Sequence, residues 1–199
     1  MVSKLIIFVQ LTLTSVFFVL DADAHSLVNG NSGFGSGFSH PILGVDHFLA
    51  MLAVGIWGAQ MGGRRIWSLP MSFPIIMCIG AIIAMTKLFT FVFVEQIIAL
   101  SVIALGLVIL VKWSPNVVVA ILIISVFAIF HGYAHGVELP KAKEPLSYVV
   151  GFVLSTGLIH LLGVGIGYFF EKFYSRKISK IIGLLIFIIG VLFFYRVYI

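Results

Sequence analysis

Charge is scarce in this sequence of 199 residues: only 10% of them are Asp, Glu, Lys or Arg, whereas 61% are hydrophobic. A soluble globular domain carries about 25% charged residues, so the composition excludes an ordinary soluble fold. Cysteine is scarcer still, because the single Cys78 excludes an internal disulfide and any Cys-x-x-Cys metal site. The sequence also lacks a Gly-x-x-x-x-Gly-Lys-Ser/Thr motif, which excludes ATP hydrolysis by a P-loop in this chain.

Long continuous apolar runs fill most of the chain, and the mean hydropathy is +1.22. Membrane β-barrels have short alternating segments instead, so the runs predict an all-α, polytopic membrane protein. The net charge of +5 is then a signal of membrane topology, and the expected partner is the lipid bilayer rather than nucleic acid. We expect one transmembrane domain, residues 40–199, with six transmembrane helices near residues 41–60, 69–87, 91–111, 117–138, 146–170 and 178–197.

The first 24 residues have the form of a secretory signal peptide. Lys4 supplies the positive charge, Leu5 to Leu20 form the apolar core, and Ala22-Asp23-Ala24 has the small-x-small form of a cleavage site. An uncleaved first membrane helix is the alternative, although sixteen apolar residues are short for a span. Residues 25–39 are rich in glycine and predict a flexible extracytoplasmic lead-in.

The distribution of Lys and Arg predicts the orientation of the chain. Cytoplasmic loops carry an excess of these residues, so we expect both ends of the mature chain on the outer side of the bacterial cytoplasmic (inner) membrane. This orientation places four Lys or Arg residues outside, namely Lys87, Lys141, Lys143 and Arg196. It places seven inside, namely Arg64, Arg65, Lys112, Lys172, Arg176, Lys177 and Lys180.

Small residues recur on two of the predicted helices. Ala128, Gly132 and Gly136 are spaced by four, and a second row consists of Gly151, Ser155, Gly163 and Gly167. Such small-xxx-small rows let membrane helices approach closely. We therefore expect the fourth and fifth helices to pack tightly against their neighbours.

Ionisable residues inside the first apolar segment indicate a function, because they are costly to bury. His40 and His47 are seven residues apart, two helical turns, and Asp46 is adjacent to His47. Two imidazoles and a carboxylate suit a borderline divalent metal such as nickel, cobalt or zinc. The alternative is a capping role for His40, with Pro41 at the first helical position, and a structural Asp–His pair.

A second group of candidate ligands lies on the fourth helix. His131, His135 and Glu138 have spacings of four and three, which place them on one stripe of the helix. The predicted topology puts this stripe at the same outer level as Asp46 and His47, and Glu95 enters the third helix at a similar depth. The alternatives are histidines that bond backbone carbonyls and, for Glu95, a charge at a loop edge.

His160 lies near the middle of the fifth helix, at a deeper level than the other candidates. A histidine inside the membrane is a functional candidate by default. A hydrogen-bonded structural histidine is the alternative.

The motifs resemble those of the HupE/UreJ family of bacterial membrane proteins, regarded as nickel or cobalt permeases that serve hydrogenase and urease maturation. The resemblance covers nearly the whole mature chain. It is most specific in the first motif, His40-Pro41, Gly44, Asp46-His47, Ala50-Met51, Val54-Gly55 and Trp57, and in the fourth-helix motif, His131-Gly132, Ala134-His135-Gly136 and Glu138. One departure is the mature N-terminus, where family members often carry several histidines and this chain has only His25.

The function that these observations predict is secondary transport of nickel(II) or cobalt(II) into the cell, without catalysis and without a prosthetic group. Metal-insertion proteins that act downstream are further candidate partners. The alternatives are a membrane-embedded metalloenzyme, or a non-transporting accessory protein, with the same ligands. Gly132 argues against a zinc protease, because it occupies the position at which those enzymes place a glutamate.

Overall fold

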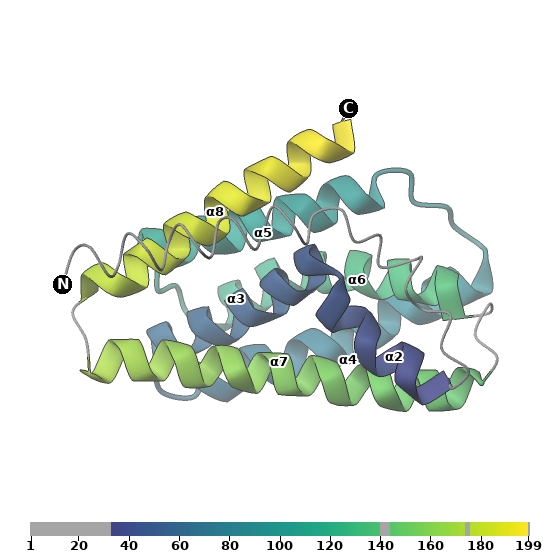
Figure 1. Cartoon of the computed structure of the whole chain (residues 1–199), viewed down its shortest axis with the longest axis horizontal. Coiled ribbons are helices and arrows are strands. Elements are labelled where there is room, and N and C mark those ends of the chain that lie inside the picture. Colours follow the sequence, from purple (N-terminus) through teal and green to yellow (C-terminus); the bar gives the residue numbers. More distant parts are fainter. Residues whose placement is uncertain (1–32, 140–143, 174–175, 199) are drawn as a thin grey trace.

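The computed structural model describes residues 33–139, 144–173 and 176–198, and the part described is helical, without strands (Figure 1). The predicted signal peptide lies outside these residues. The lead-in, expected to be flexible, is helical from Gly33 onward. The helices are α2 (Gly33–Leu43), α3 (Val45–Met61), α4 (Arg65–Thr86), α5 (Val94–Leu110), α6 (Val117–Glu138), α7 (Pro145–Phe173) and α8 (Arg176–Tyr198).

The described helices make this an all-α membrane protein that crosses the bilayer several times. Four of them, α4, α6, α7 and α8, are long and apolar enough to span a membrane, and α2 with α3 would make a fifth span as a bent pair. The prediction of six regular spans is therefore not reproduced. The third predicted span, residues 91–111, corresponds to α5, whose 17 residues extend about 25 Å at helical rise, less than the hydrocarbon thickness of about 30 Å.

The first predicted span, residues 41–60, is wrong as a continuous helix. The chain bends by 74° between α2 and α3, and Gly44 at the break has an extended conformation with φ −74° and ψ 94°. Pro41 lies inside α2 rather than at the start of a helix. Proline removes a backbone donor and glycine disfavours the helical state, so the two residues together weaken the helix at this point.

The helices pack as neighbouring pairs around α3. The most extensive contacts join α4 with α6, α5 with α8, α3 with α7, and α2 with α7. Figure 1 shows α8 lying along α5, and α2 lying across the first part of α7. Helix α3 also contacts α2, α4, α5 and α8, so it is the central element of the bundle.

Glycines make these close approaches possible, as the small-residue rows predict. A Cβ atom added to any glycine at a helix crossing would collide with the backbone of the partner helix. Because lipid supplies no hydrophobic driving force between helices, close backbone approach is a main source of their association. The glycines at the crossings are Gly80, Gly132 and Gly136 between α4 and α6, Gly55 and Gly163 between α3 and α7, Gly106 and Gly183 between α5 and α8, and Gly37 and Gly151 between α2 and α7.

Large apolar side chains cover the outside of the bundle. On α4 they form a row that faces away from α6, comprising Met71, Ile75, Ile79 and Ile82. Similar exposed rows occur on α7 and α8. Apolar surface of this extent is unusual in soluble monomers and is accounted for by contact with lipid.

Candidate metal-binding site

Four of the predicted histidines lie side by side where α2, α3 and α6 meet. The ring centroids of His40 and His135 are 4.8 Å apart, those of His47 and His135 are 4.9 Å apart, and those of His47 and His131 are 5.0 Å apart. The His40 and His47 rings are 6.0 Å apart. All four histidines are at most 7% exposed. The bend at Gly44 and the close packing of α6 thus gather imidazoles from three helices into one cluster.

Asp46 orients the imidazole of His47. The carboxylate oxygen Oδ1 accepts a hydrogen bond from His47 Nδ1 at 2.8 Å and a second from the backbone N–H of His47 at 2.8 Å. An ionised carboxylate has no proton to donate and can only accept hydrogen bonds. His47 Nδ1 therefore carries the proton. This is the arrangement in which metal-ligating histidines are held in other proteins, with Nε2 as the basic nitrogen.

His131 and His135 present buried nitrogens that need a partner. His131 Nδ1 donates to the Phe127 carbonyl at 2.9 Å, which leaves Nε2 with the lone pair. His131 Nε2 and both ring nitrogens of His135 are buried and have no hydrogen-bond partner among the residues that the structure describes. A buried polar atom without a hydrogen bond costs about 1–3 kcal/mol of folding free energy. A ligand that binds these nitrogens would remove that cost.

His160 on α7 has the same hydrogen-bond pattern as His131 but lies outside the cluster. Its Nδ1 donates to the Thr156 carbonyl at 2.8 Å, and its Nε2 is buried without a partner in the described part of the chain. The ring of Phe73 on α4 lies 5.4 Å from the His131 ring and 5.4 Å from the His160 ring. The Phe73 side chain therefore contacts both His160 and a member of the histidine cluster.

Aromatic side chains form the wall of the cluster. The Phe152 ring is 4.2 Å from the His135 ring, and Tyr148 lies 6.5 Å from His40. Phe73 is fully buried. Sequence reasoning assigned these aromatic residues no role in the site, although Phe73 and Phe152 are among the positions that resemble the family's second and fifth helices.

One predicted ligand, Glu95, is not joined to the cluster, and another, Glu138, is not described at its side chain. Glu95 is exposed in the first turn of α5 and makes no hydrogen bond or ion pair with the described residues. Glu138 is the last residue of α6, and its side chain lies outside the part that the structure describes. For Glu95 the alternative of a charge at a loop edge agrees better with the structure.

The four imidazole rings are adjacent, but their nitrogens are not directed at one common position. In the described part of the chain, no group of three or more His, Cys, Asp or Glu side chains has the arrangement of a metal site. All four ring pairs meet edge to face. The rings would have to rotate to direct several nitrogens at one ion.

Comparison with known proteins gives one family. The model of the family described as HupE / UreJ protein matches residues 12–193, which is most of the chain. The chain is 36% identical to Protein HupE of Rhizobium leguminosarum bv. viciae over 158 residues, which cover 79% of this chain and 82% of the relative. No solved structure matches. The residues matched and the level of identity show that the chain belongs to the HupE/UreJ family.

Proposed function

We propose that this protein is a secondary permease that imports nickel(II), or cobalt(II), across the cytoplasmic membrane and supplies it for hydrogenase or urease maturation. The HupE/UreJ family is associated with nickel and cobalt uptake for these enzymes. The observation that carries the proposal is the buried imidazole nitrogens of His131 and His135, which have no hydrogen-bond partner in the described structure and lie beside the Asp46–His47 pair.

Imidazoles with one carboxylate are a suitable donor set for capture. Nickel(II) and cobalt(II) are borderline ions that accept nitrogen ligands, and a neutral imidazole can replace water from the hydration shell. Asp46 adds one negative charge next to His47, which offsets part of the charge of the ion. A permease must also release its ion, so the proposed capture by the cluster must not be too tight.

His160 is the next proposed ligand for an ion that moves inward from the histidine cluster. An ion that leaves His131 meets the Phe73 ring and then the buried Nε2 of His160. A membrane potential of 100 mV, negative inside, favours inward movement by about 2.3 kcal/mol per charge, or about 4.6 kcal/mol for a dication. Inward transport therefore does not require ATP.

The proposed orientation has the histidine cluster near the outer surface and both ends of the chain outside. It treats α2 with α3 as one broken crossing and α5 as a short one, which gives six crossings. Its support is that positively charged residues meet at the other end of the bundle. Arg65 of α4 donates hydrogen bonds to Ser114 Oγ and the Pro115 carbonyl at 3.1 Å each, and Lys112 contacts Glu171 there.

The test is uptake of radiolabelled nickel and cobalt by cells that express the chain. His131→Ala should abolish most uptake at unchanged protein level, because it removes a buried ligand from the cluster. Ser125→Ala on the same helix is the matched control, since its hydroxyl only bonds the Ile121 carbonyl. Wild-type binding of nickel without any uptake would contradict the permease and leave a non-transporting accessory protein. Normal uptake by His131→Ala would refute the site.

A further inference from the structure

Thr156 on α7 carries a buried hydroxyl that the fold leaves without a partner. The residue is 0% exposed, and its Oγ1 makes no hydrogen bond with any residue that the structure describes. Burying a hydroxyl in this state is unfavourable, because the group leaves water and gains no hydrogen bond in exchange. The permease proposed above gives this hydroxyl no role, although it lies one helical turn from His160.

Other hydroxyls on the helices of this chain are satisfied by their own backbone. A helical Ser or Thr commonly donates to the carbonyl three or four residues earlier. The residues that do so here are Ser39, Ser68, Ser72, Thr86, Ser101 and Ser125. The carbonyl four residues before Thr156 belongs to Phe152, and the Thr156 hydroxyl does not bond it. This hydroxyl therefore keeps its proton and its lone pairs available for a ligand.

Thr156 lies between the histidine cluster and His160 on one face of α7. Phe152, Thr156 and His160 are spaced by four, so their side chains share this face. The Phe152 ring is 4.2 Å from the His135 ring, which places one end of the face at the cluster. The levels of Phe152 and His160 are about 12 Å apart at helical rise, with Thr156 midway. An ion that moves from the cluster to His160 along α7 therefore passes the Thr156 hydroxyl.

The backbone of Thr156 also positions His160. Its carbonyl accepts the hydrogen bond from His160 Nδ1 at 2.8 Å, so Nε2 of His160 keeps the lone pair that a metal ion needs. Within the described part of the chain, that Nε2 is buried without a partner, like the Thr156 hydroxyl. Consecutive turns of α7 thus present a hydroxyl and an imidazole nitrogen that can both take a ligand.

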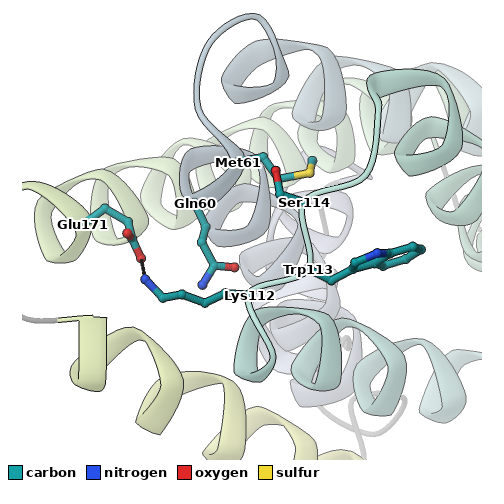
Figure 2. A pocket seen from close by; sticks show the side chains of 6 residues that line it. All are labelled: Gln60, Met61, Lys112, Trp113, Ser114 and Glu171. Carbon is teal, nitrogen blue, oxygen red and sulfur yellow. Dashed lines mark hydrogen bonds and ion pairs between the residues drawn. The ribbon is translucent and has the colours of Figure 1, made fainter.

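The carboxylate near the other end of α7 differs from Thr156 because it is already paired. Figure 2 shows Glu171 reaching toward Lys112 at a cavity of about 210 Å³. Glu171 Oε1 accepts hydrogen bonds from Lys112 Nζ and from Ser179 Oγ, at 2.6 Å each. These contacts compensate the carboxylate and tie the end of α7 to its neighbours. Thr156 lies about 22 Å from this level at helical rise, so its hydroxyl is not part of that network.

We propose that the Thr156 hydroxyl is a transfer point between the histidine cluster and His160, at which it hydrogen-bonds a water molecule carried by the ion. This role rests on the proposed function. Between two sets of imidazole ligands the ion keeps part of its hydration shell, and a dication makes its bound waters strong hydrogen-bond donors. Thr156 Oγ1 accepts such a bond, which lowers the free energy of the ion midway. A neutral hydroxyl holds the ion less tightly than imidazoles do, so the ion moves on.

The rate of nickel uptake as a function of nickel concentration, in cells that express the full-length chain, tests this role. Thr156→Val removes the hydroxyl and keeps the β-branched shape. The maximal rate should fall about tenfold, the equivalent of one hydrogen bond to a charged group. The half-saturating nickel concentration should stay at the wild-type value, because the histidine cluster still captures the ion. Thr156→Ser keeps a hydroxyl and should restore most of the rate. Normal uptake by Thr156→Val, or equally slow uptake by Thr156→Ser, would overturn the transfer point.

Ser155→Ala is the matched control for position. The Ser155 hydroxyl is also buried, and it too has no partner among the described residues. However, it lies on the row of Gly151 and Gly163, which pack against α2 and α3. Its removal should leave uptake normal. A loss as large as that in Thr156→Val would refute the assignment of the path to the face of Thr156.

Thermal unfolding of the purified proteins separates this role from a structural one. Thr156→Val removes the cost of burying an unsatisfied hydroxyl, so its unfolding temperature should equal or exceed that of wild type. A lower unfolding temperature would identify a hydroxyl that stabilises the fold and would overturn the transfer point. Normal uptake by both wild type and Thr156→Val would refute only the transfer point, whereas absence of uptake by wild type would refute the permease and the transfer point together.

Discussion

Replacing Gly136 with alanine tests how strongly the histidine cluster depends on the crossing of α4 and α6. A Cβ at this position would lie 2.5 Å from the Ala81 carbonyl oxygen and 2.7 Å from Ala84 Cβ, whereas ordinary contacts begin at 3.4 Å. The helices must therefore move apart by about 1 Å, because close-packed atoms have no other room. Overpacking of this kind costs about 1–3 kcal/mol of folding free energy, partly offset by the higher helix propensity of alanine, about 1 kcal/mol.

The same displacement should reduce transport more than stability. His135 precedes Gly136, and its ring lies within 4.9 Å of both the His40 and the His47 rings. A misplacement of about 1 Å at a site of this kind can cost about a hundredfold in rate. We expect nickel uptake by Gly136→Ala to fall by about one to two orders of magnitude.

The control is Gly165→Ala on α7. Gly165 is exposed, and a Cβ there would meet nothing within 4 Å. This variant should gain about 0.5–1 kcal/mol of stability and keep normal uptake. Thermal unfolding of the purified proteins measures the difference, since 1 kcal/mol corresponds to about 2–4 °C for a chain of this size. Equal unfolding temperatures and equal uptake for the two variants would show that the tight crossing at Gly136 is not real.

Three further predictions concern topology and the path of the ion. In a Cys78→Ser background, a cysteine in the 139–145 loop should react with an impermeant thiol reagent in intact cells and one at Arg64 should not; the opposite pattern would reverse the proposed orientation. His160→Ala should slow nickel uptake while equilibrium nickel binding stays close to wild type, and a loss of binding as large as that of His131→Ala would assign His160 to the cluster itself. Asp46→Asn should lower nickel affinity about 10- to 100-fold, measured by calorimetry, since it removes the charge that orients His47; unchanged affinity would make the Asp46–His47 pair structural.

Local signals in the sequence were enough to predict some helices closely. The fourth predicted span, residues 117–138, corresponds to α6, because the apolar run is uninterrupted and begins after a capping residue. Asn116 accepts a hydrogen bond from the Val119 N–H at 3.0 Å, which fixes the start of the helix. Spacing and topology also predicted one shared level for His47, His131 and His135. They did not predict that the rings meet, because α3 and α6 are not among the helix pairs with extensive contacts.

Other features depend on packing that no local pattern encodes. Helix α4 begins at Arg65, earlier than the predicted residue 69, although Pro70 and Pro74 lie inside it. Arg65 Nη2 donates to the Met61 carbonyl at 2.6 Å and Arg65 Nη1 bonds the loop before α6. These contacts, one to the preceding turn of chain and one to a distant loop, stabilise the first turn of a helix in which prolines discourage helix formation. The position of Phe73 between His131 and His160 likewise requires the packing of α4 against α6 and α7.

The break at Gly44 is what makes His40 part of the cluster. In a continuous helix His40 and His47 would lie on one face but about 10 Å apart along the axis. The 74° bend instead brings their rings to 6.0 Å and places His40 4.8 Å from His135. A non-helical residue inside the membrane leaves backbone groups to be satisfied, and such breaks persist where they are buried in protein or line a polar site. Here the Gly44 N–H still donates to the His40 carbonyl at 3.0 Å, so the chain turns without losing this hydrogen bond. Gly44, which the sequence analysis named only as part of the first motif, therefore determines that His40 joins the histidine cluster.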